Sequence, residues 1–236
     1  MALLASIINV FLSPTDAFQG LQDRDTARTR TTLLLILAGL GLVNLVALKD
    51  LYMNVQYDQT VQRIENSDRI SDEQKQEMLE NIDERFSNPS TGQLAIMWIT
   101  NAVGFPLRVI FMAFIVLVIG NFVFGGNLKY GDLITMTALT YMISLLELAV
   151  KIPLMNYKWS IEVYTGLGLL GLGEPGSFIR YFTNSLDIFA LWRVIVLGIG
   201  AAILYKKKST VFISAFAIYF FLQITVVSSL GAIFSP

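Results

Sequence analysis

Five long apolar stretches constrain this chain more than any other feature of its sequence. Each is bounded by charged residues or glycine, and they cover residues 31–48, 99–123, 133–150, 186–205 and 211–233. A helix needs about 20 mostly apolar residues to cross the hydrocarbon core of a bilayer. Only 15% of the residues are charged, whereas a typical soluble domain has about 25%. The sequence therefore predicts an all-α polytopic membrane bundle of five transmembrane helices.

Basic residues near the ends of these stretches predict how the bundle is oriented. Seven of them fall on one side of the membrane when the five stretches alternate in direction: Arg24, Arg28, Arg30, Lys129, Lys206, Lys207 and Lys208. Cytoplasmic loops of membrane proteins are enriched in lysine and arginine. We therefore expect a cytoplasmic N-terminus and an extracytoplasmic C-terminus.

Residues 1–30 are expected to form a cytoplasmic and interfacial region ahead of a membrane domain at 31–236. The segment 2–12 is apolar but too short to cross a bilayer. Its bulky apolar residues, Leu3, Leu4, Ile7, Ile8 and Phe11, share one helical face, with Ser6 and Asn9 opposite, which is typical of a helix lying in the membrane interface. Ser13 followed by Pro14 predicts the start of a second short helix that ends near Gly20.

The long connection at 49–93 is expected to form an extracytoplasmic helical insertion. Between residues 49 and 86 it carries ten acidic and five basic residues. Ser71 with Gln74 predicts a capping box, and the apolar residues that follow at helical spacing predict an amphipathic helix over 71–86. Such a helix is either a solvated cover of the outer face or a docking element for a partner.

The absence of cysteine and histidine removes most enzyme classes. Without them there are no disulfides, no usual transition-metal ligands, and no nucleophile and histidine pair. A net charge of −1 gives no basic surface for nucleic acid. We expect a protein that is not an enzyme and that holds no metal or cofactor.

Two further patterns resemble catalytic or cofactor motifs but lie in the wrong context. Gly166, Gly168 and Gly171 spell a dinucleotide fingerprint, yet they lie in a connection between two apolar stretches, without the strand and helix that the motif needs. This segment is expected to be a flexible or partly re-entrant loop. Asp132 and Glu174 would form a carboxylate pair, but the predicted topology places them roughly 30 Å apart across the bilayer core.

Charged residues at membrane depth are the better candidates for a site, because such residues are costly and usually face a partner or a wet cavity. Arg108 and Glu147 are expected at similar depth in adjacent spans, and Lys151 follows Glu147 by one helical turn. We hypothesise a polar binding pocket in the outer leaflet, with Asn44 and Asn101 nearby, formed by Arg108, Glu147, Lys151, Asp187 and Arg193.

A simpler interpretation stays open beside this one. Asp187 would cap a helix, Lys151 and Arg193 would extend toward the interface, and a single pair of Arg108 with Glu147 would join two helices. Small residues predict where helices approach closely: Gly39 and Gly41 in the first stretch, and Gly198 with Ala202 in the fourth.

Several segments together resemble the bacterial branch of the Yip family, named for eukaryotic proteins that interact with Ypt and Rab GTPases. They are the sequence VFLSPTDAF at 10–18, FGG at 124–126 followed by Tyr130, and SLDIFALW at 185–192. The most specific part is a signature ahead of and within a glycine-bearing helix, formed by Asp187, Phe189, Trp192, Gly198 and Gly200.

The resemblance implies a five-span protein of the bacterial inner membrane that acts by binding rather than by catalysis. Its implied partners are membrane lipids, further copies of the chain, or other membrane proteins, with ABC-type exporter subunits as one class. The alternative function is a small transporter or channel that uses the outer-leaflet charges. Such a protein would need a polar path toward the inner side, where the third stretch offers only Thr135, Thr137 and Thr140.

Overall fold

The computed structural model describes residues 3–21, 26–67 and 70–234, and in these ranges the chain is helical and has no strand. Five helical segments there are long and apolar enough to cross a membrane, which confirms the predicted all-α polytopic bundle. These are α3 (Thr26–Glu65), α5 (Thr91–Leu117) with its π-helical continuation η1 (Val118–Val123), α6 (Tyr130–Thr140) with α7 (Ile143–Lys158), α9 (Ile188–Tyr205) and α10 (Ser209–Ile233).

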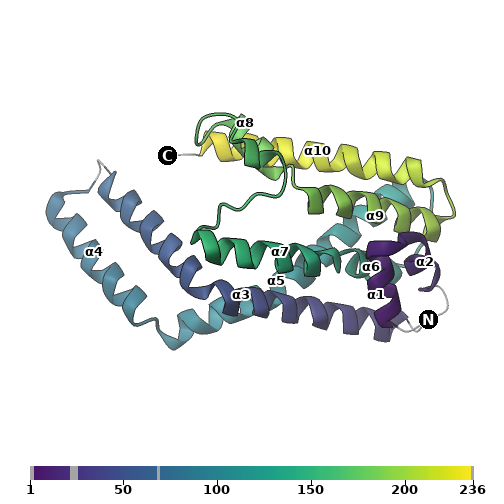
Figure 1. Cartoon of the computed structure of the whole chain (residues 1–236), viewed down its shortest axis with the longest axis horizontal. Coiled ribbons are helices and arrows are strands. Elements are labelled where there is room, and N and C mark those ends of the chain that lie inside the picture. The colour runs from purple at the N-terminus through teal and green to yellow at the C-terminus, as the bar shows by residue number, and fades with distance from the viewer. Residues whose placement is uncertain (1–2, 22–25, 68–69, 235–236) are drawn as a thin grey trace.

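The bundle has two distinct ends (Figure 1). At one end lie α1 (Leu3–Leu12), α2 (Pro14–Gln19) and the turn between α9 and α10. We call it the basic end, because it carries Arg28, Arg30, Lys129 and Lys206 to Lys208; Arg24 lies outside the described residues. At the opposite end lie α8 (Phe178–Ser185), the end of α7 and a projecting hairpin, so we call it the arm end.

The hairpin consists of the outer part of α3 and α4 (Asp72–Ser87), and we call these two segments the arm. The first apolar stretch was expected to end at residue 48, but the helix continues to Glu65 and bends away from the bundle (Figure 1). Ser71 caps α4 in the predicted capping box with Gln74. The predicted amphipathic helix is therefore confirmed, and its partner is the outer part of α3.

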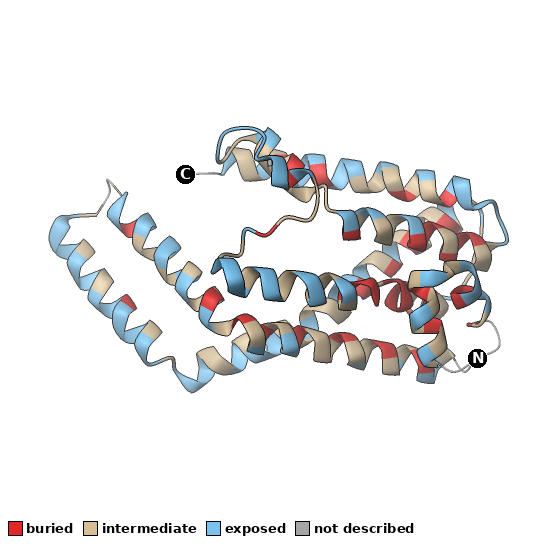
Figure 2. Cartoon of the chain, viewed as in Figure 1, coloured by how far each residue is buried: buried red, intermediate tan, exposed pale blue. Residues whose placement is uncertain are grey.

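The core of the bundle lies between the inner faces of the spans. Its largest fully buried side chains include Leu33, Leu37, Met136, Phe212 and Phe216, and Phe18 of α2 joins them from the basic end. The outer faces of α5 and α10 are apolar and exposed, and the exposed side of α10 is visible in Figure 2. A bundle that carries apolar side chains both inside and outside is what a lipid environment requires.

The N-terminal helix packs on the bundle through the side that carries Ser6 and leaves part of its predicted apolar face exposed. Ser6, expected opposite the apolar face, is fully buried together with Val10. Leu4 and Ile8 of the predicted apolar face are exposed. Because α1 packs on α2 and α6, tertiary contacts set its rotation, and a helix lying in the membrane interface stays a prediction.

The third apolar stretch, expected as one helix over 133–150, is broken. The amide of Met142 donates to the carbonyl of Leu139 at 3.1 Å, and that of Ser144 donates to the carbonyl of Tyr141 at 3.0 Å. These are tight bonds to the third preceding residue, as in a 3₁₀ turn, and they separate α6 from α7. No proline or glycine stands at the break, so local sequence did not predict it.

Two of the three glycines predicted to mark close helix contacts do so. A Cβ at Gly41 would overlap the carbonyl oxygen of Asn101 in α5, and one at Gly198 would lie 2.7 Å from the Cα of Ile213 in α10. Gly39 has no atom within 4 Å of such a Cβ, so the prediction for this residue was wrong.

Candidate functional site

Four charged side chains at the arm end form a continuous chain of ion pairs between α7 and α9. Lys151 Nζ lies 2.8 Å from Glu147 Oε1 and 2.9 Å from Asp187 Oδ2. The other oxygen of Glu147 pairs with Arg193 Nη1. All four side chains are 13–23% exposed. Because two cations meet two anions, the cluster is neutral.

Asp187 is the most connected member of this cluster. Its Oδ1 accepts hydrogen bonds from the amides of Phe189 at 2.8 Å and Ala190 at 3.3 Å, so it caps α9. Its Oδ2 accepts from the Thr165 hydroxyl as well as from Lys151. One carboxylate thus joins a helix start, a neighbouring span and the connecting loop.

Arg193 lies further along α9 than the cap and pairs with Glu147 across the helix interface. The same Nη1 lies 3.4 Å from the hydroxyl of Ser144, and the guanidinium Cζ stands 5.9 Å from the ring centre of Tyr141. These two partners flank the break between α6 and α7. The break therefore places polar groups beside the ion pairs.

Arg108 does not join the cluster, which corrects the predicted pair with Glu147. Both oxygens of Glu147 are taken by Lys151 and Arg193. Arg108 is exposed, and its guanidinium lies 5.6 Å from the ring centre of Phe105. Counting residues along two helices gives depth only, whereas the rotation of each helix decides which side chains meet.

The two asparagines expected near the pocket donate their side-chain hydrogen bonds to residues outside the ion-pair cluster. Asn44 donates to the Tyr52 hydroxyl at 3.4 Å, and Asn101 donates to the carbonyl of Met97 at 2.9 Å. The simpler interpretation was right that Asp187 caps α9, but Lys151 and Arg193 are paired rather than extended toward solvent.

The loop that holds Asp187 is ordered and is stabilised by neutral hydrogen bonds. Gly166 forms an antiparallel bridge with Asp187, and the Asn184 amide donates to the Tyr164 hydroxyl at 2.9 Å. Burial raises the pKa of Tyr164, with a further contribution from Glu162. The hydroxyl therefore stays protonated at neutral pH, and this contact does not titrate there.

The arm is a second candidate site, with its own small core. Tyr57 of α3 packs edge-on against Phe86 of α4 with ring centres 5.5 Å apart, and its hydroxyl donates to Asp83 at 2.6 Å. Ile64 and Ile82 are buried in the same seam. These contacts hold α4 on the outer part of α3, beyond the end of the bundle rather than within it.

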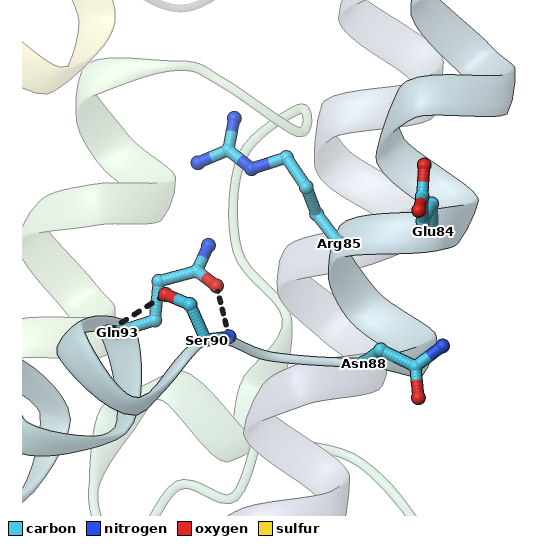
Figure 3. Close-up of a pocket in the computed structure, with 5 residues that line it drawn as sticks. All are labelled: Glu84, Arg85, Asn88, Ser90 and Gln93. Atoms are coloured by element: carbon cyan, nitrogen blue, oxygen red, sulfur yellow. Dashed lines mark hydrogen bonds between the residues drawn. The ribbon is translucent and has the colours of Figure 1, made fainter.

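Two hollows lie on the arm near its base. The larger, about 390 Å³, is open and polar, and Figure 3 shows its lining residues Glu84, Arg85, Asn88, Ser90 and Gln93. Ser90 and Gln93 form the capping box of α5, so their polar groups are already paired with each other. A second hollow of about 290 Å³ is lined by Met53, Asn54, Tyr57, Asp83, Phe86 and Ser87.

Among the described residues, no group of three or more histidine, cysteine or acidic side chains is arranged to hold a metal ion. The ion-pair chain offers two carboxylates, but lysine and arginine already neutralise them. The arrangement can therefore join helices, since its carboxylates and cations are all engaged with one another.

The signature residues of the resemblance line the packing surface of α9. Phe189 is buried, and Trp192 packs edge-on against Phe11 of α1 with ring centres 6.1 Å apart. A Cβ at Gly200 would lie 2.9 Å from both Met136 and Phe18. The signature therefore fits α9 against α1, α2, α6 and α10.

Comparison with protein families decides the relationship. The family model of the Yip1 domain matches residues 8–230, which is nearly the whole chain. The chain belongs to the Yip1 domain family. Neither a search of curated proteins nor a search of solved structures found a match.

Membership in the Yip1 domain family agrees with the five apolar helices and identifies a multi-pass membrane protein. The Yip1 domain family is a family of non-enzymatic membrane proteins. Its members interact with membrane components. The resemblance carried by residues 10–18, 124–130 and 185–192 is therefore confirmed at the level of the Yip1 domain family.

Within this Yip1 domain, Tyr205 at the end of α9 packs against residues 120–126 at the basic end, a contact that the sequence did not predict. A Cβ at Gly120 or at Gly126 would overlap the ring of Tyr205, so both positions need glycine. The Tyr205 hydroxyl donates to Asn121 at 2.8 Å. Sequence reasoning also missed Thr165 and Ser144, because a hydroxyl in an apolar stretch does not indicate its partner.

Proposed function

We propose that this Yip1 domain protein is a non-catalytic accessory protein that binds another membrane protein through its arm. The partner class is an integral membrane protein with a basic surface outside the hydrocarbon core. The resemblance to bacterial Yip proteins makes subunits of an ABC-type exporter the first candidates. In this proposal the arm lies on the extracytoplasmic side of a bacterial inner membrane, and the N-terminus is cytoplasmic.

The observation that carries the proposal is the arm itself. Residues 49–93 extend the bundle by a folded helical hairpin that no spanning function requires. Its internal contacts between Tyr57, Asp83 and Phe86 order α4 before any partner binds. A surface that is already ordered loses little conformational entropy on binding, which favours affinity.

The charge of the arm supports a basic partner. Residues 49–86 have ten acidic and five basic side chains, a net charge of −5. On α4 the side chains of Glu77, Glu80 and Glu84 are exposed. Surface charge of one sign steers a partner of the opposite sign and helps to fix orientation.

The ion-pair cluster supports an accessory role over transport. Each of its four charges is engaged by another member, and its net charge is zero. The two hollows described above lie at the arm, and none of the four cluster residues lines them. In this proposal the cluster fixes α7 to α9, and the arm does the binding.

Affinity purification tests the proposal directly. The tagged chain is extracted from native membranes in mild detergent, and co-purifying proteins are identified by mass spectrometry. We expect a membrane protein at near-stoichiometric level. The variant E77Q/E80Q/E84Q should lose it, because the exposed negative charge of α4 is removed without change of shape.

The matched control is E77D/E80D/E84D, which keeps the charge and should retain the partner. Both variants should elute as the parent protein does in size-exclusion chromatography. A chain that purifies alone under all conditions, or a partner that E77Q/E80Q/E84Q retains in full, would contradict the proposal.

A further inference from the structure

The connection between α7 and α9 carries an exposed apolar segment outside the spans. Residues 163–173 contain no charged side chain and are flanked by Glu162 and Glu174. Four leucines in this segment are 45–67% exposed: Leu167, Leu169, Leu170 and Leu172. A contiguous exposed apolar patch of this kind marks a surface that contacts something other than water.

The backbone beneath these leucines is fixed, so their exposure is a property of the fold. The amide of Leu167 donates to the carbonyl of Leu186 at 3.1 Å, and that of Ile188 donates to the carbonyl of Thr165 at 3.3 Å. Residues Leu167–Leu170 form a 3₁₀ helix, η2. A Cβ at Gly168 would overlap the ring of Tyr164, so the 3₁₀ helix packs tightly against the residues that precede it in the same connection.

The segment is continuous with the lipid-facing surface of the bundle. The 3₁₀ helix contacts α8, and α8 packs on the arm-end part of α10. There the ring of Tyr181 lies 3.1 Å from a Cβ built at Gly231. Figure 2 shows this connection exposed at the same end as the last turns of α10, where Leu230 and Ile233 are also exposed.

Two aromatic residues that precede this segment in the chain mark the expected level of the membrane interface. Tyr157 and Trp159 at the end of α7 are 89% and 56% exposed. Tyrosine and tryptophan gather at the headgroup level of membrane proteins. Arg180 of α8 lies beside Gly171 at the edge of the patch, where an arginine would reach lipid phosphates.

We propose that residues 167–172 enter the bilayer leaflet at the arm end and bury their leucines among lipid acyl chains. The occupant of this apolar surface is lipid, because the patch has no charge of its own and adjoins the lipid-facing side of α10. The connection then holds the α8 end of the bundle in the membrane, while the acidic segment 49–86, with its ten acidic residues, stays in water.

The natural absence of cysteine makes a direct test possible. Single variants L169C and L172C carry a nitroxide spin label in liposomes of phosphatidylcholine and phosphatidylglycerol. Collision with oxygen, which concentrates in lipid, is compared with collision with a water-soluble nickel chelate. F114C on the exposed face of α5 is the lipid reference, and E162C in the same connection is the water reference.

We expect labels at Leu169 and Leu172 to lose most of the nickel accessibility seen at Glu162 and to match the oxygen accessibility at Phe114. Nickel accessibility equal to that at Glu162 would overturn the proposal, because the leucines would then be in water. Protection from both reagents would also overturn it, because a second copy of the chain would then cover the patch. Two label positions are used so that a single substitution that disturbs the loop does not decide the result.

Discussion

The ammonium group of Lys151 in α7 lies 2.9 Å from a carboxylate oxygen of Asp187, the residue that caps α9. The pair therefore connects the end of one span to the start of another. Since Lys151 also contacts Glu147, and Glu147 contacts Arg193, the two helices are joined at two levels. The cluster therefore fixes α7 to α9 at the arm end of the bundle.

Replacement of Asp187 by alanine should destabilise the bundle strongly. It removes the cap of α9, the acceptor of Thr165 and the partner of Lys151 in one step. Breaking a mostly buried ion pair costs about 3–5 kcal/mol. D187N keeps a capping oxygen and should cost less than D187A. Thermal unfolding in detergent measures both, and equal losses would show that capping by residue 187 adds nothing.

Removal of the charge of Glu147 should be more harmful than removal of the charge of Arg108. E147Q leaves Lys151 and Arg193 without a common partner, and we expect a loss of about 3 kcal/mol. R108Q loses only the contact with Phe105, worth about 0.5–1 kcal/mol. Urea or SDS titration followed by circular dichroism gives the two free energies, and an equal loss in both variants would contradict the exposed position of Arg108.

A double variant separates pairing from other effects at this position. E147Q/R193Q removes one charge of each sign and should be less destabilising than the sum of the two single variants, because the neutral balance is kept. The same titration gives the free energies of unfolding of all three variants. Simple additivity would mean that Glu147 and Arg193 do not interact.

Two neighbouring glycines of α3 should respond in opposite directions to alanine. G41A places a Cβ onto the backbone oxygen of Asn101, so α3 and α5 must separate and the melting temperature should fall. G39A meets nothing within 4 Å and should stabilise α3 by about 0.5–1 kcal/mol, since alanine is the better helix former. If the melting temperature fell in both variants, the prediction that α3 approaches a neighbouring helix closely at Gly41 and not at Gly39 would be contradicted.

Single cysteines should report the orientation of the chain. Q76C on α4 and K207C after α9 lie at the arm end and the basic end, and both positions are exposed. If the N-terminus is cytoplasmic, a membrane-impermeant maleimide added to intact spheroplasts labels Q76C and leaves K207C unlabelled until lysis. The reverse labelling pattern would place the arm in the cytoplasm.

The apolar stretches and the caps could be predicted from the sequence because both are local. The length of an apolar run decides whether a helix can cross a bilayer. Each cap joins residues within one helical turn, as Ser71 does with Gln74 and Asp187 does with the amides of Phe189 and Ala190. The family signature at 185–192 is local in the same sense. These features needed no knowledge of how the spans pack.

Tertiary structure alone decided which side chains meet across helices. Arg108 and Arg193 were both expected near Glu147, and the packing of α9 brings Arg193 to it while Arg108 stays exposed. Depth in the membrane follows from counting residues, but rotation about each helix axis is set by close contacts such as those at Gly41 and Gly198. The sequence therefore determined the five spans and the local caps of α4 and α9. Packing determined the burial of Ser6, the break after α6 and the partners of Glu147, because these depend on contacts between residues far apart in the chain.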